Sequence, residues 1–271
     1  MRAAFILLLV VLVAGCRRPS YDTSTPEATL DSAVEMVRRG DARSLPSIIE
    51  IPARDIAFDD GVTEASAIAE VKDKMGEMLQ QVLRVAETLR RRFPAEVDRE
   101  LKSVLDNKKP GARDTAIAIL SDPSAWLEAQ RPRLAATDLG DGTAALTFDG
   151  EPILAGVLTL AETDDGWRFR VPVELARESP YWPDTRHEWS VLASMMLAVE
   201  HALEDFQRDL DRGKITSLSM ASSRVGRLVG ESVAVQSIIY AAMKRPENAA
   251  ANTASTPAQP PSAPAAAKPA G

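Results

Sequence analysis

Residues 65–93 read ASAIAEVKDKMGEMLQQVLRVAETLRRRF, and this stretch decides the fold. Its larger apolar residues recur in alternating steps of three and four, which aligns them along one side of an α-helix for about three heptads. They are Ile68, Val71, Met75, Met78, Val82, Val85 and Leu89. We therefore predict one long helix here, with this apolar seam packed in the core.

Further helices are predicted on both sides of this stretch. Pro94 restarts a helix that runs to about residue 106, so residues 65–106 form a helical hairpin or a bent long helix. Thr25-Pro26-Glu27 has the cap residue, early proline and acid of a helix start. The remaining predicted helices are a short one from Asp41 through Ile49, residues 112–120, one beginning at Asp122-Pro123, one from Asp184 or Thr185 to Leu210, and one from Ser217 to Met243.

From Leu134 the apolar pattern changes to a period of two, which is typical of β-strands. We predict strands over 134–137, 143–148, 153–160 and 167–173, joined by short turns as an antiparallel meander. The residues expected on its inner face are apolar: Leu146, Phe148, Leu158 and Leu160. The predicted fold class is therefore α+β, with helices packed on an antiparallel meander, a long helical insertion at about 65–106 and two C-terminal helices.

The N-terminus has the features of an export signal. Arg2 precedes an apolar run from Ala3 to Ala14, too short to span a bilayer, and Val13-Ala14-Gly15-Cys16 closes it. This tetrapeptide resembles the lipobox of bacterial lipoproteins. The resemblance implies that residues 1–15 are a signal peptide removed before Cys16, and that Cys16 is lipidated and anchors the chain in a membrane. An ordinary signal peptide with a chance cysteine is the alternative.

The length that remains without the signal and the tail suits one large domain or a domain with a helical extension. Cys16 is the only cysteine, so the chain has no intramolecular disulfide, and lipidation would account for the thiol. Residues 16–26 are predicted to be a linker, 27–245 the globular domain and 246–271 a disordered Ala/Pro-rich tail. Arg17, in place of an aspartate, favours the outer membrane in systems that sort by that residue. A net charge of −7 argues against nucleic-acid partners.

Two segments resemble small exported domains of the NTF2-like superfamily. One is the "TPEA…GD" helix pair within residues 25–49, and the other is Asp165-Gly166-Trp167-Arg168-Phe169, which resembles the last hairpin of that family. The resemblance implies a curved sheet that forms a cone-shaped pocket. Such domains do not need a helical piece like residues 65–106, and this departure puts the pocket in doubt.

Few residues are suited to catalysis. The sequence has no phosphate-binding glycine loop, no HExxH or CxxC motif and no nucleophile elbow. The only histidines, His187 and His201, are fourteen residues apart on one predicted helix, about 21 Å, so they cannot share a metal ion. His201 and Glu204 could form a weak metal pair, but an exposed histidine is the favoured interpretation. We therefore predict no catalytic, metal or cofactor-binding residues.

Three other features have both a structural and a functional interpretation. Arg90-Arg91-Arg92 is either an anion-binding patch or the solvated end of a helix. Pro180-Tyr181-Trp182-Pro183 is either a ligand-stacking platform or a loop over the sheet edge. The small residues Ser222, Gly226, Gly230 and Ala234 lie four apart, and we predict that they pack closely against the helix over 185–210.

Two functions are compatible with the sequence. The first is a non-catalytic envelope lipoprotein whose helical surfaces bind another envelope protein or a second copy of itself. The second is a small-ligand-binding protein or enzyme that uses an NTF2-like cone. The apolar inner face of the predicted sheet favours the first, because a catalytic or binding pocket needs convergent polar groups.

Overall fold

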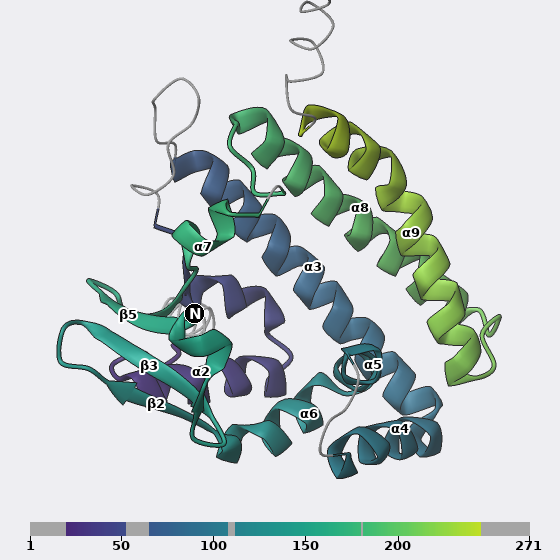
Figure 1. Ribbon diagram of the computed structural model, residues 1–271. Coiled ribbons are helices and arrows are strands. Elements are labelled where there is room, and N and C mark those ends of the chain that lie inside the picture. The colour runs from purple at the N-terminus through teal and green to yellow at the C-terminus, as the bar shows by residue number, and fades with distance from the viewer. Residues whose placement is uncertain (1–19, 53–64, 108–111, 180, 245–271) are drawn as a thin grey trace, which may run out of the picture.

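In the computed structural model, which describes residues 20–52, 65–107, 112–179 and 181–244, a small β-sheet and its covering helix lie beside a layer of long helices (Figure 1). The protein is thus of mixed α and β structure, as predicted. The predicted signal peptide, the anchor residue Cys16 and the tail 246–271 lie outside the described residues.

Three long helices form the helical layer: α3 (Ala65–Arg92), α8 (Arg186–Asp211) and α9 (Leu218–Met243). Figure 1 shows α3 beside α8, and α8 beside α9. Three shorter helices pack near the C-terminal end of α3: α4 (Pro94–Asp106), α5 (Ala112–Ser121) and α6 (Pro123–Gln130). The chain bends at Phe93, so residues 65–106 are two helices and not one continuous helix.

The helices begin where the capping residues predict. The Thr185 hydroxyl accepts a hydrogen bond from the Glu188 backbone N–H, and the Glu188 carboxylate accepts one from Thr185 in return, which is a capping box. Thr25 caps α2 (Pro26–Arg38), and Ser217 caps α9. These local bonds satisfy backbone donors that have no partner inside a helix.

Helix α3 is buried on two sides. Its predicted seam packs toward α8: Val85 and Leu89 join a cluster with Phe206, and Ile68 and Val71 join one with Trp189. On another side Leu83 packs with Val37 and Ala42, which belong to α2 and to the 3₁₀ helix η1 (Ala42–Ile48). The long helix therefore connects the helical layer with the layer that contains the sheet.

The sheet is mixed. Its strand order is β1-β6-β5-β3-β2, with β4 paired to β3. The strands are β1 (Ile49–Glu50), β2 (Leu134–Asp138), β3 (Thr143–Phe148), β4 (Glu151–Pro152), β5 (Thr159–Thr163) and β6 (Gly166–Arg170). The predicted antiparallel meander is confirmed for β2, β3, β5 and β6. It is wrong for the whole sheet, because β1 joins parallel to β6, with Ile49 opposite Phe169.

Two predicted strand boundaries are also wrong. Residues 153–160 were predicted to be a strand, but Ile153–Gly156 is a 3₁₀ helix, η4, and Gly156 has a positive φ of 87° that an extended strand does not have. The predicted strand 167–173 stops at Arg170 because Pro172 has no N–H for the ladder. A short helix, α7 (Val173–Arg177), follows.

One face of the sheet is covered by α2. Leu30 packs with Leu146, Leu160 and Trp167 in one cluster, and the Thr29 hydroxyl donates to the Trp167 carbonyl at 3.2 Å. The predicted second helix from Asp41 is the 3₁₀ helix η1, which contains Pro46, a residue without a backbone donor. A 3₁₀ helix η3 (Arg131–Arg133) leads into β2.

Candidate functional site: an apolar groove between four helices

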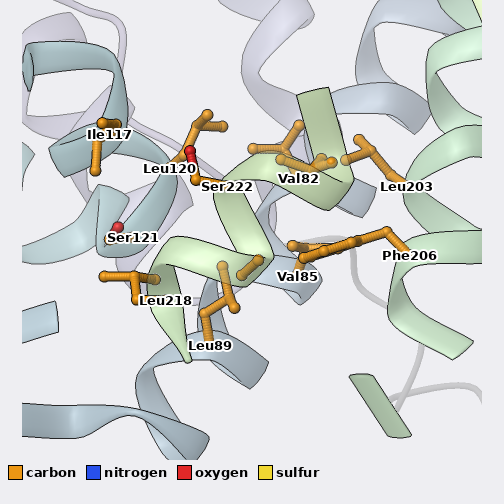
Figure 2. A pocket seen from close by; sticks show the side chains of 12 residues that line it. Val82, Val85, Leu89, Ile117, Leu120, Ser121, Leu203, Phe206, Leu218 and Ser222 are labelled. Atoms are coloured by element: carbon orange, nitrogen blue, oxygen red, sulfur yellow. The ribbon is translucent and has the colours of Figure 1, made fainter. Parts of the chain in front are cut away.

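An apolar groove opens where α3, α5, α8 and α9 meet, and we call it the helix groove. Figure 2 shows its lining side chains converging from these four helices. They are Val82, Val85, Leu89, Ile117, Leu120, Ser121, Leu203, Phe206, Leu218, Ala221, Ser222 and Val225. The two serine hydroxyls are the only polar side-chain groups of this lining, and no member is ionisable. The helix groove therefore suits an apolar group, and its lining has no ionisable residue that could act as acid or base or activate the serine hydroxyls.

The size of the helix groove limits what it can hold. Its volume is about 60 Å³, whereas pockets for drug-sized ligands measure about 300–1,000 Å³. One branched aliphatic side chain is a better match for this space than a cofactor. Beneath it Phe206 is fully buried, and Leu218 and Ala221 of α9 belong to the same cluster, so the floor of the groove is part of the main helical core.

An ionic cluster fixes the α8–α9 turn beside the helix groove. The Asp209 carboxylate accepts hydrogen bonds from Lys214 Nζ at 2.8 Å and from Arg224 Nη2 at 2.7 Å. The Asp209 side chain is 11% exposed to solvent. The hydrogen bonds from Lys214 and Arg224 hold the pKa of Asp209 below its ordinary value. These contacts join the end of α8 to the first turns of α9.

A second set of polar contacts joins the other ends of α8 and α9. Lys244 Nζ lies 2.9 Å from the Glu188 carboxylate and 2.7 Å from that of Asp184. The Tyr240 hydroxyl donates to the Tyr181 carbonyl at 2.7 Å. Burial of Lys244 opposes its charge, but the hydrogen bonds with Asp184 and Glu188 outweigh this and raise its pKa. The two helices are thus tied together at both ends.

The other sequence candidates do not form a catalytic site. His187 and His201 are both exposed on α8, and no group of three metal-binding side chains is found in the described ranges. In the arginine triplet, Arg90 pairs with Asp122 of the α6 cap, and Arg92 donates to the Leu210 carbonyl. All three arginines are exposed at the end of α3, and two of them also tie this helix to α6 and α8.

The predicted packing of the small-residue stripe is wrong. Ser222, Gly226, Gly230 and Ala234 are exposed, and a Cβ added at either glycine would meet nothing within 4 Å. Helix α9 instead turns other residues toward α8, among them Leu218, Ala221, Val225 and Tyr240. Larger side chains at steps of three and four bury more apolar area than the stripe could, and this decides the rotation of the helix.

The aromatic loop packs into a cluster that contains residues of α3 and α8 and also Ile51 and Val171, which directly follow β1 and β6 at one edge of the sheet. The Trp182 and Trp189 rings lie 5.6 Å apart and nearly perpendicular, within the cluster that contains Ile68 and Val71 of α3. Tyr181 is 70% exposed, and Pro180 lies outside the described residues. Trp182 is partly buried, and the edge-to-face contact holds its ring against Trp189.

A second hollow lies against the sheet, and we call it the sheet hollow. It has a volume of about 320 Å³. Its lining comes from α2, η1, β1, α3, the segment before β5, and β6 with the residues after it: Ala33, Leu45, Ile48, Ile49, Leu79, Leu158, Phe169, Arg170, Val171 and Pro172. Arg170 is the only ionisable residue among these. Leu79 of α3 reaches this hollow, so the long helix borders it.

The sequence pattern predicted apolar helix faces, but it did not predict that residues from four different helices meet at the helix groove. Val82, Val85 and Leu89 belong to the predicted seam of residues 65–93. Ile117 and Leu120 were not singled out, because a short helix gives too few residues for a clear periodicity. Only the packing of α5 beside α3 brings them to the helix groove.

Comparison with known proteins gives no relative: no family model, no curated protein and no solved structure matches this chain. No helix within the described ranges contains a stretch apolar and long enough to cross a bilayer.

Proposed function

We propose that this protein is a lipoprotein of the bacterial cell envelope. Cys16 anchors it to a membrane, the outer membrane being favoured, so that the domain faces the periplasm or the cell exterior. We propose further that it binds a protein partner through its helical surfaces and catalyses no reaction. The lone cysteine at the end of a short apolar run supports the anchor.

The helix groove is the observation that carries the binding role. Its lining is hydrocarbon apart from two serine hydroxyls, and its volume of about 60 Å³ suits one aliphatic side chain of a partner. Such a side chain would act as a central anchor, because a buried apolar group in a desolvated pocket contributes much of an interface's binding energy. The polar contacts around Asp209 keep α8 and α9 in place, so the partner would meet a preformed site.

The anchor is tested by labelling cells with a fatty acid that carries an alkyne group. The wild-type chain should take up the label, remain in the membrane fraction and have the mass of a chain that starts at an acylated Cys16. Cys16→Ser is the matched control and should be unlabelled and either uncleaved or soluble. An unlabelled wild-type chain would refute the anchor.

The binding role is tested with a photoreactive residue at Ser222, which lines the helix groove, and at Ser190 of α8, which is exposed but does not line it. We expect a cross-linked protein adduct of one discrete mass from position 222 and a much weaker one from position 190. Equal yields from both positions, or none, would contradict a partner in the groove.

The sheet hollow supports a second candidate function, that of a small-ligand-binding protein with an NTF2-like cone. Its volume of about 320 Å³ lies at the lower end of ligand pockets. Ala33→Leu places extra carbon in this hollow and should reduce binding of an apolar fluorescent dye, whereas Ser222→Arg at the helix groove should not. If Ala33→Leu leaves dye binding unchanged, this candidate fails.

A further inference from the structure

The outward face of α9 has no partner in the described structure although much of it is apolar. Nine large hydrophobic side chains are exposed in the described ranges, and four of them lie on this one helix: Met220, Val235, Ile238 and Ile239. Ile238 is 69% exposed. Gly226 and Gly230 face open space in the middle of the helix, where each costs about 1 kcal/mol of helix stability compared with alanine.

The charges on this face are few and of opposite sign. Arg224, Arg227 and Glu231 are the only charged residues of α9, and Arg224 is bound to Asp209. Arg227 and Glu231 are exposed, and neither forms an ion pair in the described part of the chain. A membrane-surface helix would instead have a basic polar face and large lipid-facing side chains.

We propose that this face binds a second copy of the same chain, with the two α9 helices antiparallel. Consider a two-fold axis perpendicular to α9 at the level of Val229 along the helix. It would place Arg227 opposite Glu231 of the second copy, because these residues lie two positions before and two positions after Val229. The same axis would place Met220 opposite Ile238 of the second copy, nine residues to either side. The face is therefore complementary to itself in both charge and apolar contact, as an isologous interface requires.

The small side chains give this pairing its geometry. Ser223 and Ala234 lie between the apolar ends on the side of α9 that carries Met220 and Ile238, and Gly230 lies at the edge of that side. These small residues leave room for the helix axes to approach to about 8 Å. The 26 residues of α9 span about 39 Å, so a strip about 10 Å wide offers roughly 400 Å² per copy. This is about half of the area per partner in a standard interface. The dimer is therefore weak in solution, and anchoring both copies to one membrane would raise their effective concentration.

The first test uses disulfide formation in the membrane fraction of cells that express the full chain. Gly230→Cys places a thiol next to the axis, where it should meet its symmetry mate and give a dimer of twice the chain mass. Ser219→Cys is the matched control: it is exposed on α9, but it would lie about 30 Å from its mate, too far for a disulfide. The wild-type chain shows whether Cys16 by itself gives a disulfide-linked dimer.

Several results would overturn the proposal. Equal cross-linking from Gly230→Cys and Ser219→Cys would show random collision, and an adduct of another mass at Gly230→Cys would show a different partner. Absence of any dimer from Gly230→Cys would also refute it. This test rests on the proposed Cys16 anchor, which the fatty-acid label tests separately, and none of its results depends on the helix groove or decides the binding role proposed there.

The second test exchanges the charges. Arg227→Glu alone or Glu231→Arg alone places like charges opposite each other at two symmetric positions, and should weaken the dimer about tenfold in sedimentation of the full chain in detergent. The double variant R227E/E231R should restore it. Equal thermal midpoints would show that the fold is unchanged. If the double variant stays as weak as either single one, the antiparallel register is wrong.

Discussion

Gly76 lies inside α3, and Gly226 and Gly230 lie inside α9. The structure predicts that alanine destabilises the protein at Gly76 and stabilises it at the other two positions. At Gly226 and Gly230 the new methyl group meets nothing within 4 Å, so only helix propensity changes. Each substitution should stabilise the folded chain by about 1 kcal/mol. At Gly76 of α3 the methyl group would lie 2.8 Å from the Arg43 backbone oxygen, and this overpacking should cost about 1–3 kcal/mol and exceed the gain in propensity.

The assay is thermal unfolding followed by circular dichroism at low protein concentration, where the outward face of α9 is uncovered. For a chain of this size 1 kcal/mol corresponds to a shift of about 2–4 °C in the midpoint. Gly226→Ala and Gly230→Ala should each raise the midpoint by about that amount, and Gly76→Ala should lower it. Destabilisation by both α9 variants would mean that α9 is rotated differently from the structure, and stabilisation by Gly76→Ala would mean that α3 does not closely approach η1.

Three further predictions concern the core, the ionic cluster and the tail. Phe206→Ala removes a fully buried ring from the main helical cluster and should cost about 3–5 kcal/mol in urea unfolding; a loss below 1 kcal/mol would contradict its place in the core. Because the pKa of Asp209 is lowered in the folded chain, its stabilisation is present above its ordinary pKa of 3.8 and is lost as the pH falls through the folded value. Asp209→Asn should therefore lower the midpoint at pH 7 and flatten its decline in acid, and an unchanged acid decline would exclude this contribution. Truncation at Pro246 should leave the midpoint nearly unchanged, because the tail lacks large apolar side chains, and a drop of several degrees would show that the tail docks.

Local sequence signals determined most of the helix boundaries. Thr25, Thr185 and Ser217 each accept a hydrogen bond from a backbone N–H of the helix that they precede, and Pro94 sets the break after α3. Such signals act within one turn of helix, so their effect does not depend on the rest of the fold. The alternating pattern likewise determined β2 and β3, because a half-buried strand has the same period in any sheet.

Tertiary packing decided what these elements do. The seam of α3 was visible in the sequence, but its second buried side, with Leu83 and Gly76 against α2 and η1, depends on chain segments that lie 33 to 46 residues away. The parallel pairing of Ile49 with Phe169 joins strands more than 100 residues apart, and no local pattern encodes it. The small-residue stripe of α9 was predicted to pack against α8, but larger residues of α9 pack there and the stripe is exposed. A sequence pattern shows which residues share a face, whereas the competition among faces for buried area decides which face turns inward.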